Sequence, residues 1–371
     1  MKSRQWLAVV PLVATLAVGV AACGSSSSDN GNPSSSSSGS GSGSSGGTIN
    51  GAGSTLAQPI YQQWGSDLKD QGITLNYQGV GSGAGVAAFA SGTADFAASD
   101  PALTPDDKKT IKKSPPVQIP TVFGAITVAY NVPGIDKGLK LDGKTVADMF
   151  LGKVKKWNDP EIASQNPGLK LPDTAVTIVH RSDESGTTKG FTTFLADYSP
   201  EWKSQVGSDK TVKWPTGTGA AKNSGVAAAV KQTSGAVGYV EQAYALQNNF
   251  TTADVKNKSG KYVTPSLEST SAAGEGLTIP PDLGIVAINA PNPAAYPIVS
   301  QTFIMVHQDL CKGGMSQGNA KALVSFLNYA LGDGQNVAKQ LFYAPLPAPL
   351  LSKAKAQLSK LQCNGSPIAA S

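Results

Sequence analysis

The chain has 371 residues, of which 40% are hydrophobic and 15% are charged, and its formal net charge is +5. This balance is unremarkable. Two short lysine clusters have no interleaved aromatic residues, so we interpret them as solvated surfaces and expect no nucleic-acid partner. The clusters are Lys108, Lys109, Lys112 and Lys113, and Lys153, Lys155 and Lys156.

The N-terminus has the pattern of a secretory signal peptide with a lipidation site. Lys2 and Arg4 precede an apolar run from Trp6 to Val20, and small residues lead up to Cys23. We expect cleavage before Cys23 and acylation of that cysteine, which would anchor the protein at the extracytoplasmic face of the cell membrane. An uncleaved membrane helix is the alternative, but the apolar run is short for a bilayer span.

Residues 23–47 follow the cleavage site, and after Cys23 they are nearly all serine and glycine. Such a segment offers no apolar surface to offset the entropy of ordering, so we expect a flexible tether. A Gly/Ser coil of this length has an r.m.s. span of roughly 25 to 30 Å, which lets the folded part reorient beside the membrane. About 320 residues remain, which suits two lobes of ordinary domain size.

Strand-like and helix-like runs alternate through these residues, which predicts an α/β fold. Two β-rich stretches, 117–132 and 295–307, contain internal proline or glycine and are candidates for crossings between the lobes. We expect the C-terminal helices to pack against the first lobe. The other predicted strands include 73–78, 95–99 and 176–181, and the predicted helices include 86–90, 191–196, 316–331 and 350–361.

Cysteine and histidine are rare outside the signal region. Cys311 and Cys363 would be two thiols in an oxidising compartment, so we expect them to form a disulfide. These two cysteines with His180 and His307, the only histidines, do not have the number or spacing of a zinc site. We therefore expect no metal and no cofactor.

Three short segments share one pattern, a glycine-containing loop with hydroxyl residues immediately before a helical run. Helix N-termini carry free N–H groups and the positive end of the helix dipole, and serine or threonine adds a hydroxyl donor. One such segment alone would be an ordinary helix cap. Three of them aimed at one place would make an anion site. The segments are 51–56, 79–85 and 181–188.

Two catalytic interpretations compete with an anion site. Residues 79–84 imitate a dinucleotide-binding fingerprint, with Asp100 further on, but an exported lipoprotein has no dependable supply of NAD or FAD. Ser185, with His180 nearby, imitates the nucleophile loop of a serine protease. Neither histidine has the sequence context of a base oriented by an acid, so a hydrolase stays a minor alternative.

Several longer sequence landmarks occur in a fixed order along the chain. They are 51–55 (GAGST), 77–82 (YQGVGS), 95–100 (DFAASD), 157–160 (WNDP), 181–187 (RSDESGT), 212–215 (VKWP) and 235–241 (GAVGYVE). On these landmarks the chain, from Gly51 to roughly Leu361, resembles the phosphate-specific substrate-binding proteins of Pst phosphate ABC transporters, the PstS family. The resemblance implies a type II periplasmic-binding-protein fold, in which two lobes, each a sheet flanked by helices, close about a hinge on one phosphate.

The resemblance also implies how the chain is divided. After a signal peptide at 1–22 and the lipidated tether at 23–47, the first lobe would be discontinuous, with residues 48–124 and 299–371. Residues 125–298 would form the second lobe. We expect a monomer.

The resemblance carries the family's phosphate contacts onto eight positions of this sequence. Ser54 would support the site, and Asp183 would orient Arg181. Leu56 stands where relatives often carry an aromatic residue and Gly83 where many have a second serine, but neither departure removes a charge. The implied contacts are Thr55, the backbone of Leu56, Ser82, Asp100, Arg181, Ser185, Gly186 and Thr187.

The function that follows is high-affinity binding of inorganic phosphate and its delivery to an ABC importer, whose permease subunits work with a cytoplasmic ATPase. Neutral donors with Arg181 as one planar cation can satisfy the oxygens of a tetrahedral anion, so no nucleophile or base is required and we expect no enzyme. Asp100 would favour phosphate, which carries a proton, over sulfate, which has none. The alternatives are a receptor for another oxyanion such as sulfate, a secreted phosphatase, or a surface adhesin.

Overall fold

The structure is a computed structural model that describes residues 46–368. The predicted signal peptide, the predicted lipidation site at Cys23 and nearly all of the predicted tether lie outside the described residues. Within residues 46–368, the helices are too short or too polar to cross a membrane.

The strands of the main sheet fall into two sets that share one long strand, β4. In the first set β1, β2 and β3 are parallel, and β12 runs antiparallel between β3 and β4. In the second set β8 pairs with β4 and is followed by the parallel strands β6 and β7. The strands are β1 Gly47–Gly53, β2 Ile73–Gly79, β3 Phe96–Ser99, β4 Pro116–Asn131, β6 Thr177–Arg181, β7 Thr218–Ala220, β8 Ala236–Glu241 and β12 Val299–His307.

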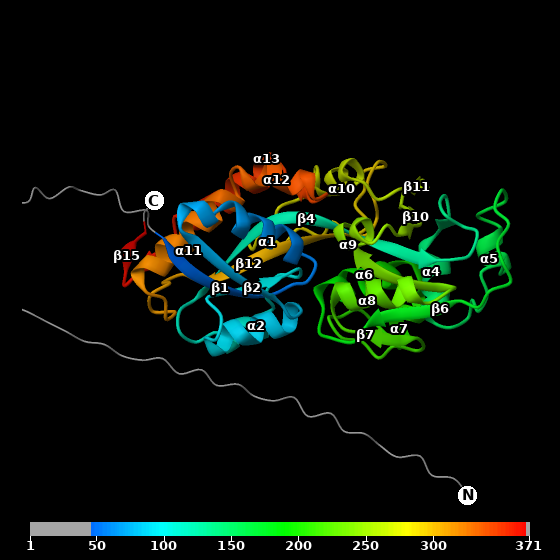
Figure 1. The fold of residues 1–371 in the computed structure, drawn as a ribbon, viewed down its shortest axis with the longest axis horizontal. Coiled ribbons are helices and arrows are strands. Elements are labelled where there is room, and N and C mark those ends of the chain that lie inside the picture. Colours follow the sequence, from blue (N-terminus) through cyan, green and yellow to red (C-terminus); the bar gives the residue numbers. More distant parts are fainter. Residues whose placement is uncertain (1–45, 369–371) are drawn as a thin grey trace, which may run out of the picture. The chain divides into compact units, whose positions relative to one another are not determined.

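Helices cover both sets of strands and make two α/β lobes. Figure 1 shows that the first lobe combines the blue N-terminal and the orange to red C-terminal parts of the described chain, while the green middle part makes the second. The first lobe carries α1 Gln58–Asp67, η1 Lys69–Gln71, α2 Ser82–Ser91, α3 Pro105–Thr110, α11 Gln317–Ala330, α12 Gly334–Gln340 and α13 Ala348–Leu358. The second carries α4 Gly143–Phe150, α5 Pro160–Ala163, α6 Gly186–Tyr198, α7 Pro200–Gln205, α8 Lys222–Gln232, α9 Gln242–Gln247 and α10 Leu267–Gly274.

Short strands complete the lobes. The pairs β13 and β4, and β9 and β4, extend the main sheet, while β11, β10 and β5 form a three-stranded sheet and β14 and β15 a two-stranded one. These strands are β5 Lys140–Leu141, β9 Thr251–Thr252, β10 Asp254–Lys256, β11 Tyr262–Val263, β13 Ala344–Pro345, β14 Gln362–Cys363 and β15 Ser366–Pro367.

Aromatic side chains fill the core of each lobe. In the first, Trp64 of α1 and Phe96 of β3 both meet Phe326 of α11, with ring centroids 6.2 and 6.0 Å apart. The C-terminal helix α11 therefore packs on the N-terminal strands, as the sequence predicts. In the second lobe, Phe191 of α6 stacks on Tyr239 of β8 with centroids 4.3 Å apart. Such pairs stabilise a core beyond the apolar area that they bury.

The long strand β4 changes partner in its middle. It pairs with β12 as far as Ala125, opposite Val299, and with β8 from Ile126, opposite Glu241. A proline lacks the N–H that a ladder needs, and the register of β4 against β12 shifts beside Pro120, where a bulge absorbs it. The predicted β-rich stretch at 117–132 is confirmed. The stretch predicted at 295–307 begins only at Val299, because Pro297 lies before the strand.

Two helices begin earlier than their apolar periodicity indicates. The helix expected at 86–90 is α2 and begins at Ser82, and the helix expected from Phe191 is α6 and begins at Gly186. Glycine and hydroxyl residues fill both first turns, and such residues give no periodic apolar signal. Ser82 and Thr187, two of the predicted contacts, therefore lie in the first turn of a helix and not in a loop before it.

Cys311 and Cys363 form a disulfide that holds the C-terminal hairpin of β14 and β15 against the chain after β12. Asp309 reinforces this contact by accepting hydrogen bonds from the backbone N–H groups of Asn364 and Gly365 at 3.0 and 2.9 Å.

We predict that replacing both cysteines by serine lowers the free energy of unfolding by up to about 4 kcal/mol, because the disulfide closes a loop of 52 residues in the unfolded chain. Urea denaturation of the ligand-free protein measures the change. Thiol titration of the exported wild-type protein is the control, and two free thiols there would contradict the pairing.

Candidate functional site

Polar residues of both lobes meet in one buried place between the lobes. The first lobe contributes the turn after β1, the N-terminus of α2 and the residue after β3, and the second contributes the end of β6 and the N-terminus of α6. Of the eight sequence-predicted contact positions, one, Gly186, has no side chain. The side chains of the other seven are at least nine-tenths buried there. The side chains are those of Thr55, Leu56, Ser82, Asp100, Arg181, Ser185 and Thr187.

Asp100 is the only acid among the predicted contacts, and it is only 4% exposed. Its carboxylate accepts a hydrogen bond from the Ser54 hydroxyl at 2.5 Å and a longer one from the Ser82 hydroxyl at 3.5 Å. Burial raises the pKa of Asp100 to about 6, against the lowering effect of those hydrogen bonds and of the charge on Arg181. Near neutral pH the site therefore contains a buried carboxylate that can still accept further hydrogen bonds.

Arg181 is held by Asp183 in a bidentate ion pair. Arg181 Nε and Nη2 donate to the two carboxylate oxygens of Asp183 at 2.7 and 2.5 Å. Burial alone would raise the pKa of Asp183, but the hydrogen bonds and charge of Arg181 outweigh it and hold that pKa below its usual value. The pair fixes the plane of the guanidinium and leaves the Nη1 edge, which reaches Thr187 Oγ1 at 3.4 Å, facing the other site residues.

The N-terminus of α6 points into the site. The Ser185 hydroxyl caps the helix by accepting from the Thr188 N–H at 3.1 Å. Gly186 follows, and its N–H donates across the lobes to Ser82 Oγ at 3.2 Å. A Cβ atom at Gly186 would lie 2.4 Å from a carboxylate oxygen of Asp100, so only glycine allows this approach. The positive end of the α6 dipole thus lies beside Asp100.

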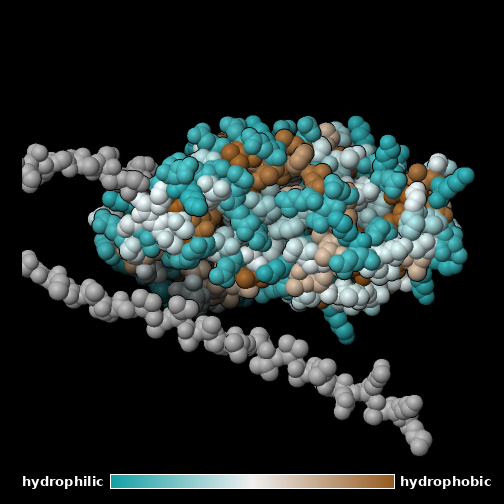
Figure 2. Space-filling view, viewed as in Figure 1, coloured by the Kyte–Doolittle hydropathy of each residue, from teal (hydrophilic) through white to brown (hydrophobic). Residues whose placement is uncertain are grey.

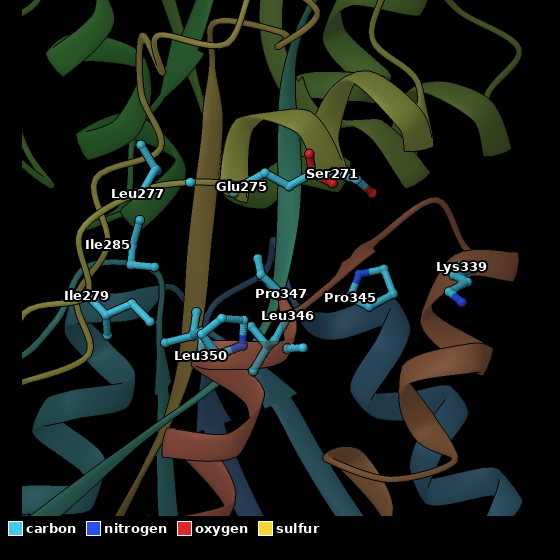
Figure 3. Close-up of a pocket in the computed structure, with 14 residues that line it drawn as sticks. Ser271, Glu275, Leu277, Ile279, Ile285, Lys339, Pro345, Leu346, Pro347 and Leu350 are labelled. Carbon is cyan, nitrogen blue, oxygen red and sulfur yellow. The ribbon is translucent and has the colours of Figure 1, made fainter.

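A cavity of about 350 Å³ lies next to this place, and Asp100, Gly186, Val286 and Ile288 are among the residues that line it. A separate pocket of about 520 Å³ lies over α10 and α13 and contains none of the predicted contacts. Leu277, Ile279 and Leu350 line it (Figure 3), and Figure 2 shows apolar surface in the same region.

Comparisons with known proteins identify the family. A model of the PBP superfamily domain matches residues 38–333. Phosphate-binding protein PstS of Pasteurella multocida is 41% identical over 314 residues, which cover 84% of this chain and 89% of that protein. PstS of Methanocaldococcus jannaschii is 38% identical and covers 77% and 79%, and PstS 3 of Mycobacterium leprae is 34% identical and covers 95% and 98%. This chain belongs to the PstS family.

Solved structures show the same fold at lower identity. The chain superimposes on a human phosphate-binding apolipoprotein with a TM-score of 0.69 at 21% identity, covering 86% of this chain and 99% of that one. The phosphate-binding protein of Stenotrophomonas maltophilia gives a TM-score of 0.63, with 84% and 93% covered and 21% identity. The predicted two-lobed fold of type II periplasmic binding proteins is confirmed.

The structure shows the surroundings of Gly83 and Leu56, the two positions where the sequence departs from the expected family pattern. A Cβ atom at Gly83 would lie 1.8 Å from the carboxyl carbon of Glu184, and Glu184 is ion-paired with Lys210 at 2.9 Å. Glu184 therefore occupies the space that a serine at position 83 would need. Leu56 is fully buried, and its backbone C=O accepts a hydrogen bond from Tyr343 at 2.7 Å.

Two buried polar residues at this place are absent from the sequence-based set. Asn223, the second residue of α8, lies between Thr55 and Thr187 and donates to both. Glu241, the last residue of β8, forms a hydrogen bond with the Tyr343 hydroxyl, with Oε2 3.0 Å from Oη, and so joins the second lobe to the first. Only Ala221 and Lys222 separate Asn223 from β7, so it lacks the glycine-containing loop that marks the three predicted segments. Glu241 belongs to a family landmark but carries no sequence signal of its role.

Glu241 is fully buried, and burial raises its pKa well above the usual value despite the hydrogen bonds from Tyr343 and backbone N–H groups. Its Oε1 has no hydrogen-bond partner among the described residues. Burial without a cation favours the neutral acid, so the folded protein keeps this proton to a higher pH than the unfolded chain does.

We predict that this proton makes the stability of the protein fall with rising pH. The contribution is fully present below the unfolded pKa of about 4.3 and is lost as pH rises toward the folded pKa, by up to about 1.4 kcal/mol per pH unit. Glu241→Gln cannot titrate, so its free energy of unfolding should fall less than that of the wild type between pH 5 and pH 8. The exposed Glu275→Gln is the matched control, and parallel curves for wild type and Glu241→Gln would contradict the account.

Proposed function

We propose that the protein binds inorganic phosphate outside the cytoplasm and delivers it to an ABC importer of the Pst type. The observation that carries this proposal is the buried place between the lobes, where one arginine, hydroxyl groups and a helix N-terminus surround one buried carboxylate. The curated relatives, named phosphate-binding proteins, support the choice of ligand.

The donors suit a tetrahedral anion. The free edge of Arg181 provides a planar cation, the Thr55 and Thr187 hydroxyls are donors, and the first N–H groups of α6 add a dipole of the right sign. Fixed neutral donors can hold a doubly charged anion in a water-poor cleft without an equal number of cations, because each hydrogen bond to a charged oxygen contributes roughly 1.5 to 3 kcal/mol.

Binding without catalysis is the simpler chemistry for this set. The His180 ring stacks on Trp214, with centroids 4.6 Å apart, and the His307 ring lies against Phe89 at 4.4 Å. Their Nδ1 atoms bond to the backbone C=O groups of Arg181 and Ser114, and neither ring bonds to a serine hydroxyl in the described chain, as a hydrolase triad would require. We therefore infer a binding protein and rank the secreted phosphatase well below it.

Asp100 provides the choice between phosphate and sulfate, which have the same shape and nearly the same size. Near neutral pH phosphate carries at least one proton and can donate it to the Asp100 carboxylate, whereas sulfate has no proton to donate. Sulfate would place an anionic oxygen against a buried carboxylate without a hydrogen bond between them. It should therefore bind at least two orders of magnitude more weakly than phosphate, which corresponds to about 2.7 kcal/mol.

We propose that the lobes comprise residues 48–124 with 299–371, and residues 125–298, and that they close by a hinge motion. The change of partner along β4 at Ala125 and Ile126 supports a hinge between Phe123 and Ile126, and the antiparallel start of β12 supports a second one between Tyr296 and Ser300. Each lobe supplies only part of the donor set, so the ligand favours the closed form.

The remaining parts of the proposal concern the cell. The signal pattern supports export and acylation at Cys23, and the family supports docking to permease subunits as a monomer. Metabolic labelling with a fatty acid tests the anchor, since a Cys23→Ser variant should lose both the label and its association with the membrane.

We predict that Asp100→Asn gains sulfate binding while phosphate binding changes less. The amide supplies a donor to an anionic oxygen and removes the repulsion. Isothermal calorimetry with phosphate and with sulfate, on wild type and variant, measures both changes. A variant that excludes sulfate as strongly as the wild type would refute the selectivity mechanism, and a wild type that does not bind phosphate would refute the function itself.

The pH dependence of the wild type is a second check on the same carboxyl. Because the pKa of Asp100 is about 6, the group is a neutral acid and a donor below that pH. Sulfate should therefore bind the wild type more tightly at pH 5 than at pH 8, and the Asp100→Asn variant should show a smaller difference.

A further inference from the structure

We propose that Asn223 is a positioning residue that forces the hydroxyls of Thr55 and Thr187, one from each lobe, to donate their protons to the bound anion. The inference rests on the proposed function. Asn223 is not itself a predicted ligand contact, but it selects the closed arrangement of the lobes, in which both hydroxyls can bind the anion. The inference is carried by the hydrogen bonds around one fully buried amide.

The orientation of the Asn223 amide is determined by its neighbours. The backbone N–H of Glu241 donates to Asn223 Oδ1 at 3.0 Å, and a backbone N–H can only donate. The oxygen of the amide therefore faces β8, and its NH₂ group faces the site. Asn223 consequently presents only donors to the two threonines.

Asn223, together with Arg181 at Thr187, donates hydrogen bonds to both lone pairs of each threonine hydroxyl oxygen. Thr55 Oγ1 accepts from Asn223 Nδ2 at 2.9 Å and from the Asn223 backbone N–H at 3.4 Å. Thr187 Oγ1 accepts from Asn223 Nδ2 at 3.3 Å and from Arg181 Nη1 at 3.4 Å. A hydroxyl has two lone pairs and one proton, so each threonine keeps a single role, that of donor. Neither hydroxyl donates to another group within residues 46–368, which leaves both protons for an anion.

The backbone around Asn223 is held in place at some energetic cost. Lys222, directly before it, has a φ of 67°, in the left-handed region that a lysine rarely adopts. Its N–H donates to Asp183 Oδ1 at 2.9 Å, and Asp183 holds Arg181. Strained positions of this kind persist where the surroundings over-determine them, and they cluster at functional sites. The start of α8 is therefore tied to the same ion pair that orients the arginine.

The amide also spans the two lobes. Asn223 and Thr187 both belong to the second lobe, whereas Thr55 follows β1 in the first, so the hydrogen bond from Asn223 to Thr55 exists only when the lobes are closed. The Tyr244 hydroxyl, from α9 of the second lobe, adds a contact to the Thr55 C=O at 2.8 Å. Opening the cleft would release the Thr55 hydroxyl from its donor-only role, which couples closure to the capacity to bind the anion.

Phosphate titration of Asn223 variants by calorimetry tests the inference. Asn223→Ala should raise the phosphate Kd about tenfold, the equivalent of one hydrogen bond, because both hydroxyls regain the freedom to turn away. Asn223→Asp keeps the size of the side chain but presents acceptors and a negative charge, and should raise Kd at least 100-fold near neutral pH. Asn223→Ser keeps one donor, so its phosphate Kd should lie between those of the wild type and Asn223→Ala. This variant replaces Asn223→Asp in the test if the aspartate variant does not fold.

Two controls separate positioning from a structural role. Asn166→Asp changes another buried asparagine, whose side chain bonds, within the described residues, only to the backbone of Lys140 and Ile162, and should lower the melting temperature without changing the phosphate Kd. In a Thr55→Val background, Asn223→Ala should raise Kd by less than it does in the wild type, because one of its two targets is gone.

Wild-type affinity, within about twofold, in both Asn223→Ala and Asn223→Asp would overturn the inference. So would an unchanged effect of Asn223→Ala in the Thr55→Val background, because Asn223 would then act independently of that hydroxyl. Failure of the wild-type protein to bind phosphate at all is a different result, which overturns the proposed function and this inference with it.

Discussion

The interaction on which the rest of the structure depends is the burial of opposite charges between two lobes. Arg181 is 2% exposed and Asp100 is 4% exposed, and charged groups without water need fixed partners. Asp183 holds one edge of the guanidinium, and Ser54 holds the carboxylate. These partners come from both lobes, so the site is complete only when the lobes meet. We propose that the bound anion stabilises the closed arrangement, in which the two lobes meet.

The same constraint explains the polar residues behind the site. A hinge between two lobes must pass through a buried region, and its polar groups must stay satisfied in the closed form. Glu241 meets Tyr343 there, and Tyr343 donates to the C=O of Leu56, whose backbone N–H is a proposed contact. Asn223 Oδ1 accepts a hydrogen bond from the Glu241 N–H, and Asn223 Nδ2 donates one to Thr55 Oγ1. The hinge and the anion site are thus joined by one continuous set of hydrogen bonds, through which closure can affect affinity.

Much of this could be predicted from the sequence, and the remainder depends on contacts that a sequence does not show. The alternation of strands and helices, the long strand at 117–132 and the family landmarks predict the fold. Hydroxyl residues before helices, such as Ser82 and Ser185, mark the anion site because a helix N-terminus needs no distant partner to be recognised. Each of these signals lies within a short segment of the chain.

Asn223 and Glu241 could not be found in this way. The role of Asn223 depends on Thr55, 168 positions away in the chain, and that of Glu241 on Tyr343, 102 positions away. Tertiary contacts of this kind determine which of many polar residues have a part in the site.

Small-angle scattering tests the central claim, that phosphate and not sulfate closes the two lobes. The radius of gyration should be measured for the ligand-free protein, with phosphate and with sulfate, near pH 8, where Asp100 with a pKa of about 6 is ionised. We predict a smaller radius with phosphate than without it, and no change with sulfate. The same radius with and without phosphate would contradict the account.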